Sequence, residues 1–427
     1  MASSPVSAHE RAWVNPHPED QFVVSPKHGF LPRHDPLSQL PKAFSALESL
    51  LQRMPRIQDS GKPGLLATGD FGKAVLEELP LYDVSSIEDP QLLSALYRDY
   101  TFAASAYLLE PCDLEYRRTG KYGLARPVLP KSIAVPLCIV ADKLGAKPFM
   151  EYALSYGLYN FQRKRMDKPA DLDNVSTVRG FTNTEDEKGF ILVHVSMVRH
   201  SGPLVQQAMQ ALESAGAGDR QAFDRAMEGM ATSYSRINGA MEQMWKASKT
   251  DGYINFRAFI MGSKNQPMFP QGIHYEGVDP DMVEGNQGHN GRFYRGESGA
   301  NDSMIPLGDN LLELTSRMPS NPLTSVLRDF RQYRPRNHQS FLAWVESRAS
   351  EVGIHAYSRS SPVSAALTLA VLDQIRDFRH RHWLFTKEYI LKHTKHPVAT
   401  GGSPIVTWLP NQLSAVLGAM EDLGKVI

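Results

Sequence analysis

Two histidines occupy positions at which helical periodicity would otherwise place an apolar side chain. His382 lies on an apolar stripe between Phe378 and Phe385, and His194 lies within the segment GFILVHVSMV. A lone histidine on an apolar face is most often a hydrogen-bonded core residue. The same placement also suits an axial ligand to a cofactor, with the second histidine lining the opposite side. The pattern alone leaves both interpretations open.

Other chemistries find little support in the sequence. His380 and His382 form an HxH pair, but residues two apart on a helix point about 200° away from each other, so both cannot bind one metal ion. The sequence contains no HExxH, CxxC, EF-hand, GxGxxG, Walker A or GxSxG motif. Nucleotide-binding, zinc-dependent and serine-hydrolase functions therefore have no motif to support them.

The composition is that of an ordinary globular protein. The 427 residues include 46 basic and 46 acidic side chains, so the formal net charge is zero and no excess of positive charge favours nucleic acid or an anionic membrane. Cys112 and Cys138 are the two cysteines, which excludes a disulfide scaffold. No apolar run reaches the roughly 18 residues of a membrane span, and the N-terminus lacks the apolar core of a secretory signal. We expect a soluble, cytoplasmic protein.

Apolar residues recur with helical spacing along most of the chain, and strand-like alternation is scarce. The sequence therefore predicts an all-α fold, with helices over residues 41–54, 91–110, 189–200, 203–215, 219–248, 322–332, 338–350, 361–394 and 409–424.

Three segments have the composition of connections. Residues 162–188 are polar and are the best candidate for a domain boundary or a long crossing loop. Residues 262–303 are dense in Gly, Asn, Pro and Asp, and a run this long is usually a functional loop or lid. The segment ATGGS, Ala399–Ser403, is expected to act as a flexible hinge.

Six sequence segments are more specific together than any one is alone. The series resembles indoleamine 2,3-dioxygenase, the haem enzyme that opens the indole ring of tryptophan. Order and spacing match over about residues 130–410, and the first 130 residues fit more loosely. The segments are SIAVPLCIVADKLGAKPFMEYA (132–153), GFILVH (189–194), FRAFIMGSKNQP (256–267), RGESGANDS (295–303), RHRHWLFTKEYI (379–390) and ATGGS (399–403).

The resemblance implies a two-domain helical haem protein. A smaller domain and N-terminal arm over residues 1–180 would cover the distal pocket, and a larger domain over 181–427 would hold haem b. His382, seven residues before Tyr389, matches the proximal iron ligand. Arg379 matches an arginine that pairs with a haem propionate. From the sequence alone, Arg379 could equally pair with Asp373 or Asp377 along its own helix.

The resemblance also implies a substrate site. Arg257 matches the arginine that binds the substrate carboxylate. A planar guanidinium group suits this role because it can donate two parallel hydrogen bonds to a carboxylate. We count Arg257 and His194 as the catalytic residues. Tyr152 matches an aromatic residue of the distal pocket, although it could also be an ordinary core tyrosine. Ser298 and Gly299 match the small residues that leave room for the indole above the haem, and Ser298 is also counted with His382 and Arg379 among the haem-binding residues. Thr400 matches a mobile-loop residue near the amino-acid end of the substrate.

Two positions depart from the mammalian pattern. His194 stands where that enzyme has a serine. A neutral imidazole could orient the indole N–H, but it would deprotonate so weak an acid poorly. Gly252 stands where the mammalian enzyme has a pocket phenylalanine, with Tyr253 beside it, so the pocket is expected to be larger or repacked there.

The resemblance implies that O2 adds across the C2–C3 bond of L-tryptophan and that both oxygen atoms reach the product, N-formylkynurenine. It also implies an electron donor that keeps the haem iron ferrous, and we expect a monomer. Three alternatives stay open: a haem monooxygenase or biosynthetic enzyme acting on a modified tryptophan or indole, a non-catalytic haem- or indole-binding protein, and a purely structural helical protein.

Overall fold

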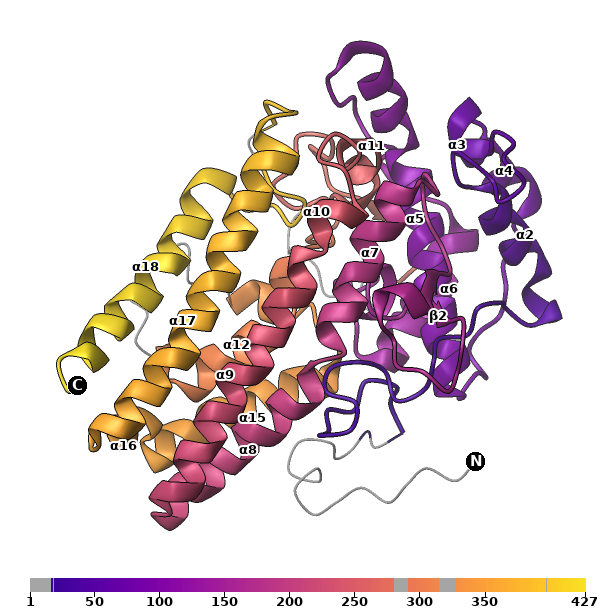
Figure 1. The fold of residues 1–427 in the computed structure, drawn as a ribbon. Coiled ribbons are helices and arrows are strands. Elements are labelled where there is room, and N and C mark those ends of the chain that lie inside the picture. Colours follow the sequence, from indigo (N-terminus) through magenta and orange to yellow (C-terminus); the bar gives the residue numbers. More distant parts are fainter. Residues whose placement is uncertain (1–16, 18, 280–290, 315–327, 397) are drawn as a thin grey trace.

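The structure is a computed structural model that describes residues 17, 19–279, 291–314, 328–396 and 398–427. Helices make up most of these residues, which confirms the all-α fold (Figure 1). The described strands are two or three residues long and form two small pairs: β1 (Val128–Leu129) runs parallel to β4 (His274–Tyr275), and β2 (Phe161–Arg163) runs antiparallel to β3 (Val175–Thr177). None of the described helices combines the length and the apolar character that a membrane-crossing segment needs.

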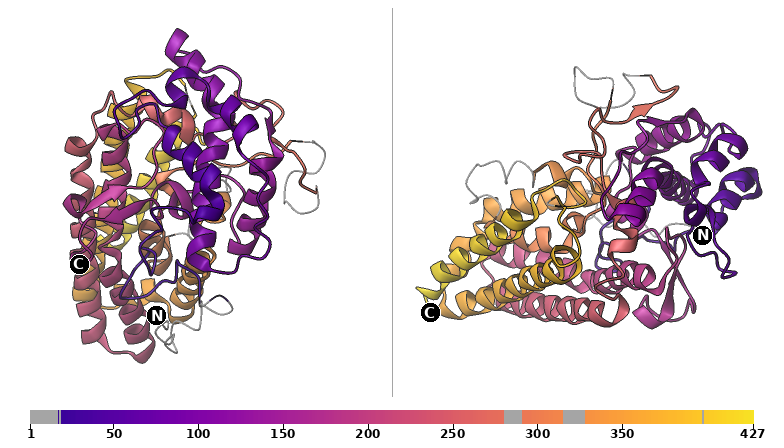
Figure 2. Two further views of the ribbon diagram at one scale, coloured as in Figure 1. Left: turned by 90° about the vertical axis from the view of Figure 1, so that its right-hand side faces the viewer. Right: turned by 90° about the horizontal axis from the view of Figure 1, so that it is seen from above.

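The first half of the chain gathers on one side of the molecule (Figures 1 and 2). Its long element is α5, which packs against α6, α4 and α2. The elements are η1 (Lys42–Phe44), α2 (Ser45–Arg53), α3 (Leu65–Thr68), α4 (Phe71–Glu78), α5 (Pro90–Thr119), α6 (Lys131–Leu144), the π-helix η2 (Tyr152–Tyr156) and η3 (Leu172–Asn174).

The second half forms a bundle in which α9 packs against α8 and α17, and α17 packs against α18 (Figure 1). Its elements are α7 (Glu185–Val198), α8 (Ser201–Ala217), α9 (Arg220–Glu242), α10 (Met244–Ala247), α11 (Ile254–Arg257), η4 (Ala258–Ile260), η6 (Gly299–Asn301), α12 (Met304–Leu311), α15 (Arg336–Val352), α16 (Ile354–Arg359), α17 (Pro362–Phe385), the π-helix η7 (Thr386–Leu391) and α18 (Ile405–Gly424).

Helix α5 is longer than its predicted 91–110 because its interior proline is compensated. It begins with the Asp89 side chain accepting a hydrogen bond from the Leu92 N–H at 2.7 Å, and it continues through Pro111. A proline lacks the N–H that would bond to the carbonyl four residues earlier. The guanidinium of Arg126 donates to that carbonyl, on Tyr107, so the helix loses no partner there.

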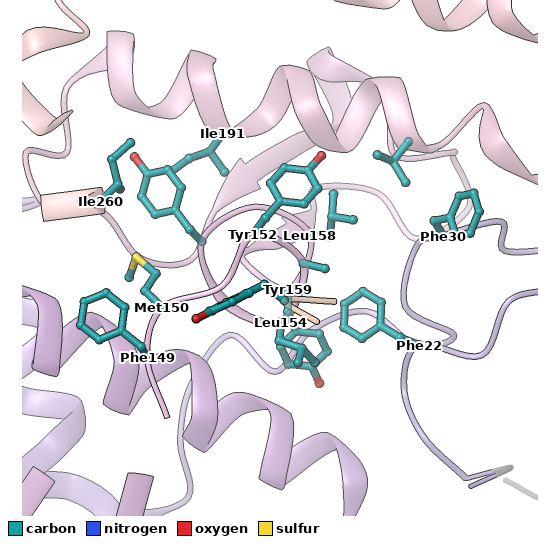
Figure 3. Close-up of a cluster of buried hydrophobic side chains, with 14 of the residues drawn as sticks. Phe22, Phe30, Phe149, Met150, Tyr152, Leu154, Leu158, Tyr159, Ile191 and Ile260 are labelled. Atoms are coloured by element: carbon teal, nitrogen blue, oxygen red, sulfur yellow. The ribbon is translucent and has the colours of Figure 1, made fainter. Parts of the chain in front are cut away.

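The π-helix η2 and the residues around it join the N-terminal arm to the core. Figure 3 shows Tyr152, Leu154 and Tyr159 in one cluster with Phe22 and Phe30, all of them 3% exposed or less. A π-helical turn is rare and frequently marks a functional site. Here it leads from α6 toward α7, which carries His194.

The other predicted helices are present with shifted ends. The predicted helix 361–394 becomes α17 followed by η7, so its regular part ends at Phe385. The predicted helix 322–332 lies mostly outside the described residues. The described residues of 262–303 are largely irregular, as expected, with β4 and η6 as short exceptions. The division of the chain at residue 180 stays a prediction.

Candidate functional site

One cavity lies where α7, α9, α10, α17 and η7 meet two loops, 297–299 and 399–405. Its empty space, including its open mouth, is about 990 Å³. Five of the eight residues that the sequence singled out line this one cavity: His194, Ser298, Gly299, His382 and Thr400. Tyr152, Arg257 and Arg379 do not line it and are placed separately below.

His382 lies on the cavity face of α17, one turn before the start of η7. Among the described residues, neither of its ring nitrogens has a hydrogen-bond partner, and Thr386 instead donates to its backbone carbonyl at 3.0 Å. Burial, with a smaller contribution from nearby His194, lowers the pKa of His382 to about 4. The ring is therefore neutral at pH 7, which is the form that binds a metal ion.

His194 reaches the cavity from α7 with a defined tautomer. Its Nδ1 lies 2.8 Å from the Phe190 carbonyl oxygen, which can only accept, so Nδ1 carries the proton. Burial lowers the pKa of His194, so the ring is neutral and Nε2 is a free acceptor. A Cβ at position 299 would lie 3.7 Å from Nε2, so Gly299 leaves open the space in front of it.

Arg257, at the end of α11, is a buried cation without an acidic partner among the described residues. Its side chain is fully buried, and Nη2 donates to the Val398 carbonyl at 2.8 Å, while Nε and Nη1 have no hydrogen-bond partner in the part of the chain that the structure describes. It lies behind the cavity wall: Tyr253, one turn earlier on the chain, lines the cavity, as do the residues that follow Val398. A buried guanidinium in this state suits a carboxylate ligand.

Arg379 pairs with neither of the acids that its own helix offers. Its Nη2 donates to Asp309 Oδ2 at 2.6 Å, whereas Asp373 and Asp377 pair with Arg376. Nε and Nη1 of Arg379, and Oδ1 of Asp309, are buried without a partner among the described residues. Pairing along the helix is therefore wrong, and the guanidinium keeps donors for a further acceptor.

Tyr152 supports the site from behind. It is 1% exposed, and its ring meets the imidazole of His194 edge-on at a centroid distance of 5.5 Å. Its hydroxyl is buried without a partner among the described residues. Tyr152 thus packs against His194 without lining the cavity itself.

Of the two outcomes expected at Gly252, a larger or a repacked pocket, the structure shows the second, because Gly252 itself does not line the cavity. A Cβ at this position would lie 2.2 Å from the carboxylate of Asp186, so the glycine is needed for a close contact outside the cavity. The next residue, Tyr253, lines the cavity together with Phe190, and their ring centroids lie 5.2 Å apart. Tyr253, next to the position of the expected phenylalanine, therefore supplies the aromatic side chain of the pocket.

The loop that carries Thr400 is tied down at several points. The Gly262 N–H donates to the Thr400 carbonyl at 3.0 Å, Gln266 donates to the Ala399 carbonyl at 2.8 Å and Arg295 donates to the Gly401 carbonyl at 2.7 Å. These bonds hold the loop over the cavity. Its predicted mobility stays a prediction.

Sequence analysis missed Glu297, which also lines the cavity. Its side chain is 2% exposed, and burial raises its pKa to about 8. The signal was available, because Glu297 is an acid flanked by Gly296 and Ser298 in the motif RGESGANDS. An ionisable residue among small residues in such a segment is a candidate functional residue, as is a histidine on an apolar stripe.

Comparison with known proteins covers nearly the whole chain. The family model described as indoleamine 2,3-dioxygenase matches residues 18–407. Indoleamine 2,3-dioxygenase of Saccharomyces cerevisiae is 28% identical over 395 residues, which cover 87% of this chain and 80% of that protein. Indoleamine 2,3-dioxygenase 1 of Mus musculus is 24% identical over 406 residues, covering 94% and 91%. The 6-hydroxytryptophan 2,3-dioxygenase of Fusarium equiseti is 23% identical over 411 residues, covering 95% and 93%.

Proposed function

The chain belongs to the indoleamine 2,3-dioxygenase family, and we propose that it cleaves the indole C2–C3 bond of L-tryptophan with O2 to give N-formylkynurenine. Enzymes of this family are haem-dependent dioxygenases, so haem is the cofactor and the protein is an oxidoreductase of the tryptophan and indoleamine type. The family relatives include one named for a modified tryptophan, so the identity of the indole amino acid is part of the proposal.

The residues of the cavity fit a haem. His382 offers a neutral, unpartnered imidazole from one wall, and Met241, Met244 and Phe385 beside it supply apolar contacts. Arg379, three residues before His382, keeps two buried donors that suit a propionate. When bound, the haem iron supplies the redox chemistry that makes O2 reactive toward the indole.

The remaining residues would bind and orient the substrate. Arg257 would hold the carboxylate through its unpartnered Nε and Nη1, and Thr400 would lie near the amino-acid end. The neutral Nε2 of His194 would accept a hydrogen bond from the indole N–H, which orients the ring without removing its proton. Tyr253 and Phe190 would pack against the ring and exclude water.

One observation carries this proposal: a single cavity is lined by two neutral histidines, and an arginine with no acidic partner lies buried behind its wall. A purely structural helical protein would have no use for three polar side chains in this state, because each keeps at least one ring or guanidinium nitrogen without a partner among the described residues, which costs stability.

The test is the mass of the product formed from L-tryptophan by haem-loaded, ascorbate-reduced protein under isotopically labelled O2. We expect N-formylkynurenine with two labelled oxygen atoms. A product with one labelled oxygen would favour a monooxygenase. Absence of product from a protein that still binds haem and L-tryptophan would favour a binding protein. The electron donor, the monomeric state and the cytoplasmic location belong to the proposal as well.

A further inference from the structure

Glu297 is the one cavity-lining acid of the described residues, and the reaction outlined above gives it no task. Its side chain is 2% exposed, and Oε1 is buried without a hydrogen-bond partner among those residues. Burying a carboxyl group without a partner is costly, so a donor brought by a ligand would relieve that cost.

The cation nearest to Glu297 along the chain is already paired. Nη2 of Arg295 lies 2.6 Å from Oδ2 of Asp329, and its Nη1 donates to the Gly401 carbonyl at 2.7 Å. Because no cation of the described residues offsets it, burial raises the pKa of the Glu297 carboxyl group to about 8. A cationic group of a ligand would act against this rise and favour the carboxylate form.

Glu297 enters the cavity beside the loop 399–405. Both of its neighbours in the chain lie against that loop: a Cβ at Gly296 would lie 2.6 Å from the Thr400 carbonyl oxygen, and a Cβ at Gly401 would lie 3.5 Å from the Cβ of Ser298. These contacts place the backbone of Glu297 next to Thr400 and Gly401, and its side chain lines the cavity from there.

Arg257 approaches the same stretch of chain. Its Nη2 donates to the carbonyl of Val398, which is two residues before Thr400. Two residues of chain span at most about 7 Å. The two buried groups of opposite charge, Arg257 and Glu297, therefore both lie at the 398–401 end of the site.

The indole end of the site is marked by another residue of the same segment. A Cβ at Gly299 would lie 3.7 Å from Nε2 of His194, the atom assigned above to the indole N–H. From Gly296 to Gly299 the segment thus passes from the loop to His194. Glu297 stands nearer the loop, where the amino-acid part of a substrate would lie if its carboxylate is on Arg257.

Arg257 and Glu297 each lack a counter-charge, and they do not pair with each other. A zwitterionic amino acid carries both missing charges on one carbon atom. Its α-carboxylate can accept from the guanidinium, and its α-ammonium can donate to the carboxylate of Glu297 in a charge-assisted hydrogen bond.

We propose that Glu297 is a specificity-determining residue that binds the α-ammonium group of the substrate, so that the cavity selects indoles that carry a free α-amine as well as a carboxylate. The inference rests on the proposed function, because it assumes that an indole amino acid binds in this cavity with its carboxylate on Arg257.

The experiment compares three ligands that share the indole ring and differ in the charged groups. L-Tryptophan has both groups, indole-3-propionate lacks the α-ammonium and tryptamine lacks the carboxylate. Binding to the haem-loaded protein is measured by titration calorimetry without O2, so that no turnover occurs. For the wild-type protein we expect L-tryptophan to bind about tenfold or more tightly than indole-3-propionate, as for a gained charge-assisted hydrogen bond.

Variants then assign this preference to one side chain. E297M keeps similar length and removes the charge, and E297A is a second test if E297M does not retain haem. Both should weaken binding of L-tryptophan and tryptamine about tenfold or more and leave that of indole-3-propionate nearly unchanged. E297Q, which keeps an acceptor oxygen without the charge, should show a smaller loss.

The matched control is E151Q. Glu151 is 1% exposed and has a pKa raised to about 8, but it does not line the cavity. E151Q should keep the wild-type ratio of the affinities for L-tryptophan and indole-3-propionate, because the substitution removes a buried carboxyl group away from the ligand.

The outcomes separate this inference from the proposed function. No preference for L-tryptophan in the wild type, a preference that survives in E297M and E297A, or an equal loss for all three ligands would overturn the role of Glu297 even if L-tryptophan is dioxygenated. A preference that depends on Glu297, in a protein that forms no doubly labelled product, would support the inference and overturn the proposed reaction.

Discussion

Arg179 and Arg257 are both buried arginines, but they differ in their partners: Arg179 pairs with carboxylates, and Arg257 has no acidic partner among the described residues. Arg179, which precedes α7, donates to both oxygens of Asp99 at 3.1 and 2.8 Å and to both oxygens of Glu48 at 3.1 and 2.6 Å. These carboxylates raise the pKa of its guanidinium against the effect of burial. Arg257, near the cavity, has one backbone acceptor and two nitrogens without a partner among the described residues.

Glu187 and Glu297 show the same difference in hydrogen-bond partners. Glu187, 1% exposed, accepts hydrogen bonds from the backbone N–H groups of Phe181, Thr182 and Asn183 at 2.7 to 2.9 Å, and it fixes the turn into α7. Glu297 is as deeply buried and has no partner among the described residues.

The two regions differ in whether the protein itself supplies the hydrogen-bond partner of the buried group. Where the chain supplies it, the buried charge specifies the fold, and removing it leaves other groups unsatisfied. Where the chain leaves donors or acceptors without partners beside a cavity, the polar group lowers stability, and we infer that it is retained for a ligand. This contrast predicts that substitutions in the two regions affect different measurements.

The largest expected effect is on haem binding. His382→Ala should abolish the haem absorption band and all activity, because it removes the unpartnered imidazole of the cavity wall. The unfolding midpoint of the haem-free protein should change little, since the ring makes no hydrogen bond within the described fold. His380→Ala, on the exposed side of the same helix, is the control and should keep its haem. Normal haem content in the first variant would refute the assignment.

A second test compares the effects of replacing Arg179 and Arg257 on stability and on substrate binding. Arg179→Leu should lower the free energy of unfolding by about 3–5 kcal/mol, because buried Asp99 would keep only Arg98 as a cationic partner and Glu48 would lose its bidentate contact with the guanidinium. Arg257→Leu should leave that free energy unchanged or higher and weaken L-tryptophan binding by roughly 10- to 100-fold, as expected for a lost charge-assisted bond. Urea denaturation and substrate titration measure the two quantities. Equal destabilisation by both variants would contradict the claim that Arg179 stabilises the fold and Arg257 serves ligand binding.

The smallest effect concerns pH. The pKa of Glu297 is raised to about 8 from 4.5, so between these values the unfolded chain releases a proton that the folded chain keeps. The stability linked to this group is therefore fully present below pH 4.5 and is lost as pH rises toward 8. E297Q lacks this dependence. Its stability relative to the wild type should rise by on the order of 1–3 kcal/mol from pH 5.5 to 8. Urea midpoints of the haem-loaded proteins at both pH values measure it, and a constant difference would contradict the burial argument.

The sequence was informative where a local pattern carried the signal. Helical periodicity predicted the all-α fold, and the break in the apolar stripe of α17 singled out His382 before any family was considered. The ordered motifs then pointed to the family that the comparison confirms over residues 18–407. Arg257 was singled out only through the resemblance to that family.

Local pattern could not show which polar residues lack partners, because partners come from distant parts of the chain. Arg379 had two acids on its own helix and pairs with Asp309, 70 residues away. At Gly252 the pocket was expected to be larger or repacked; a side chain there would meet Asp186 outside the cavity, and the neighbouring Tyr253 lines the cavity instead. Helix α5 runs through Pro111 because Arg126 supplies the missing donor.

The sequence by itself determined that this chain forms helices around buried histidines and which family it resembles, because periodicity and motif order are local and linear properties. Only the tertiary structure decided that Glu297 lines the same cavity as His194 and His382 and that Arg257 has no acidic partner among the described residues. Burial and the satisfaction of hydrogen bonds depend on segments distant in sequence, and the free energy of an ionised side chain depends on that whole environment.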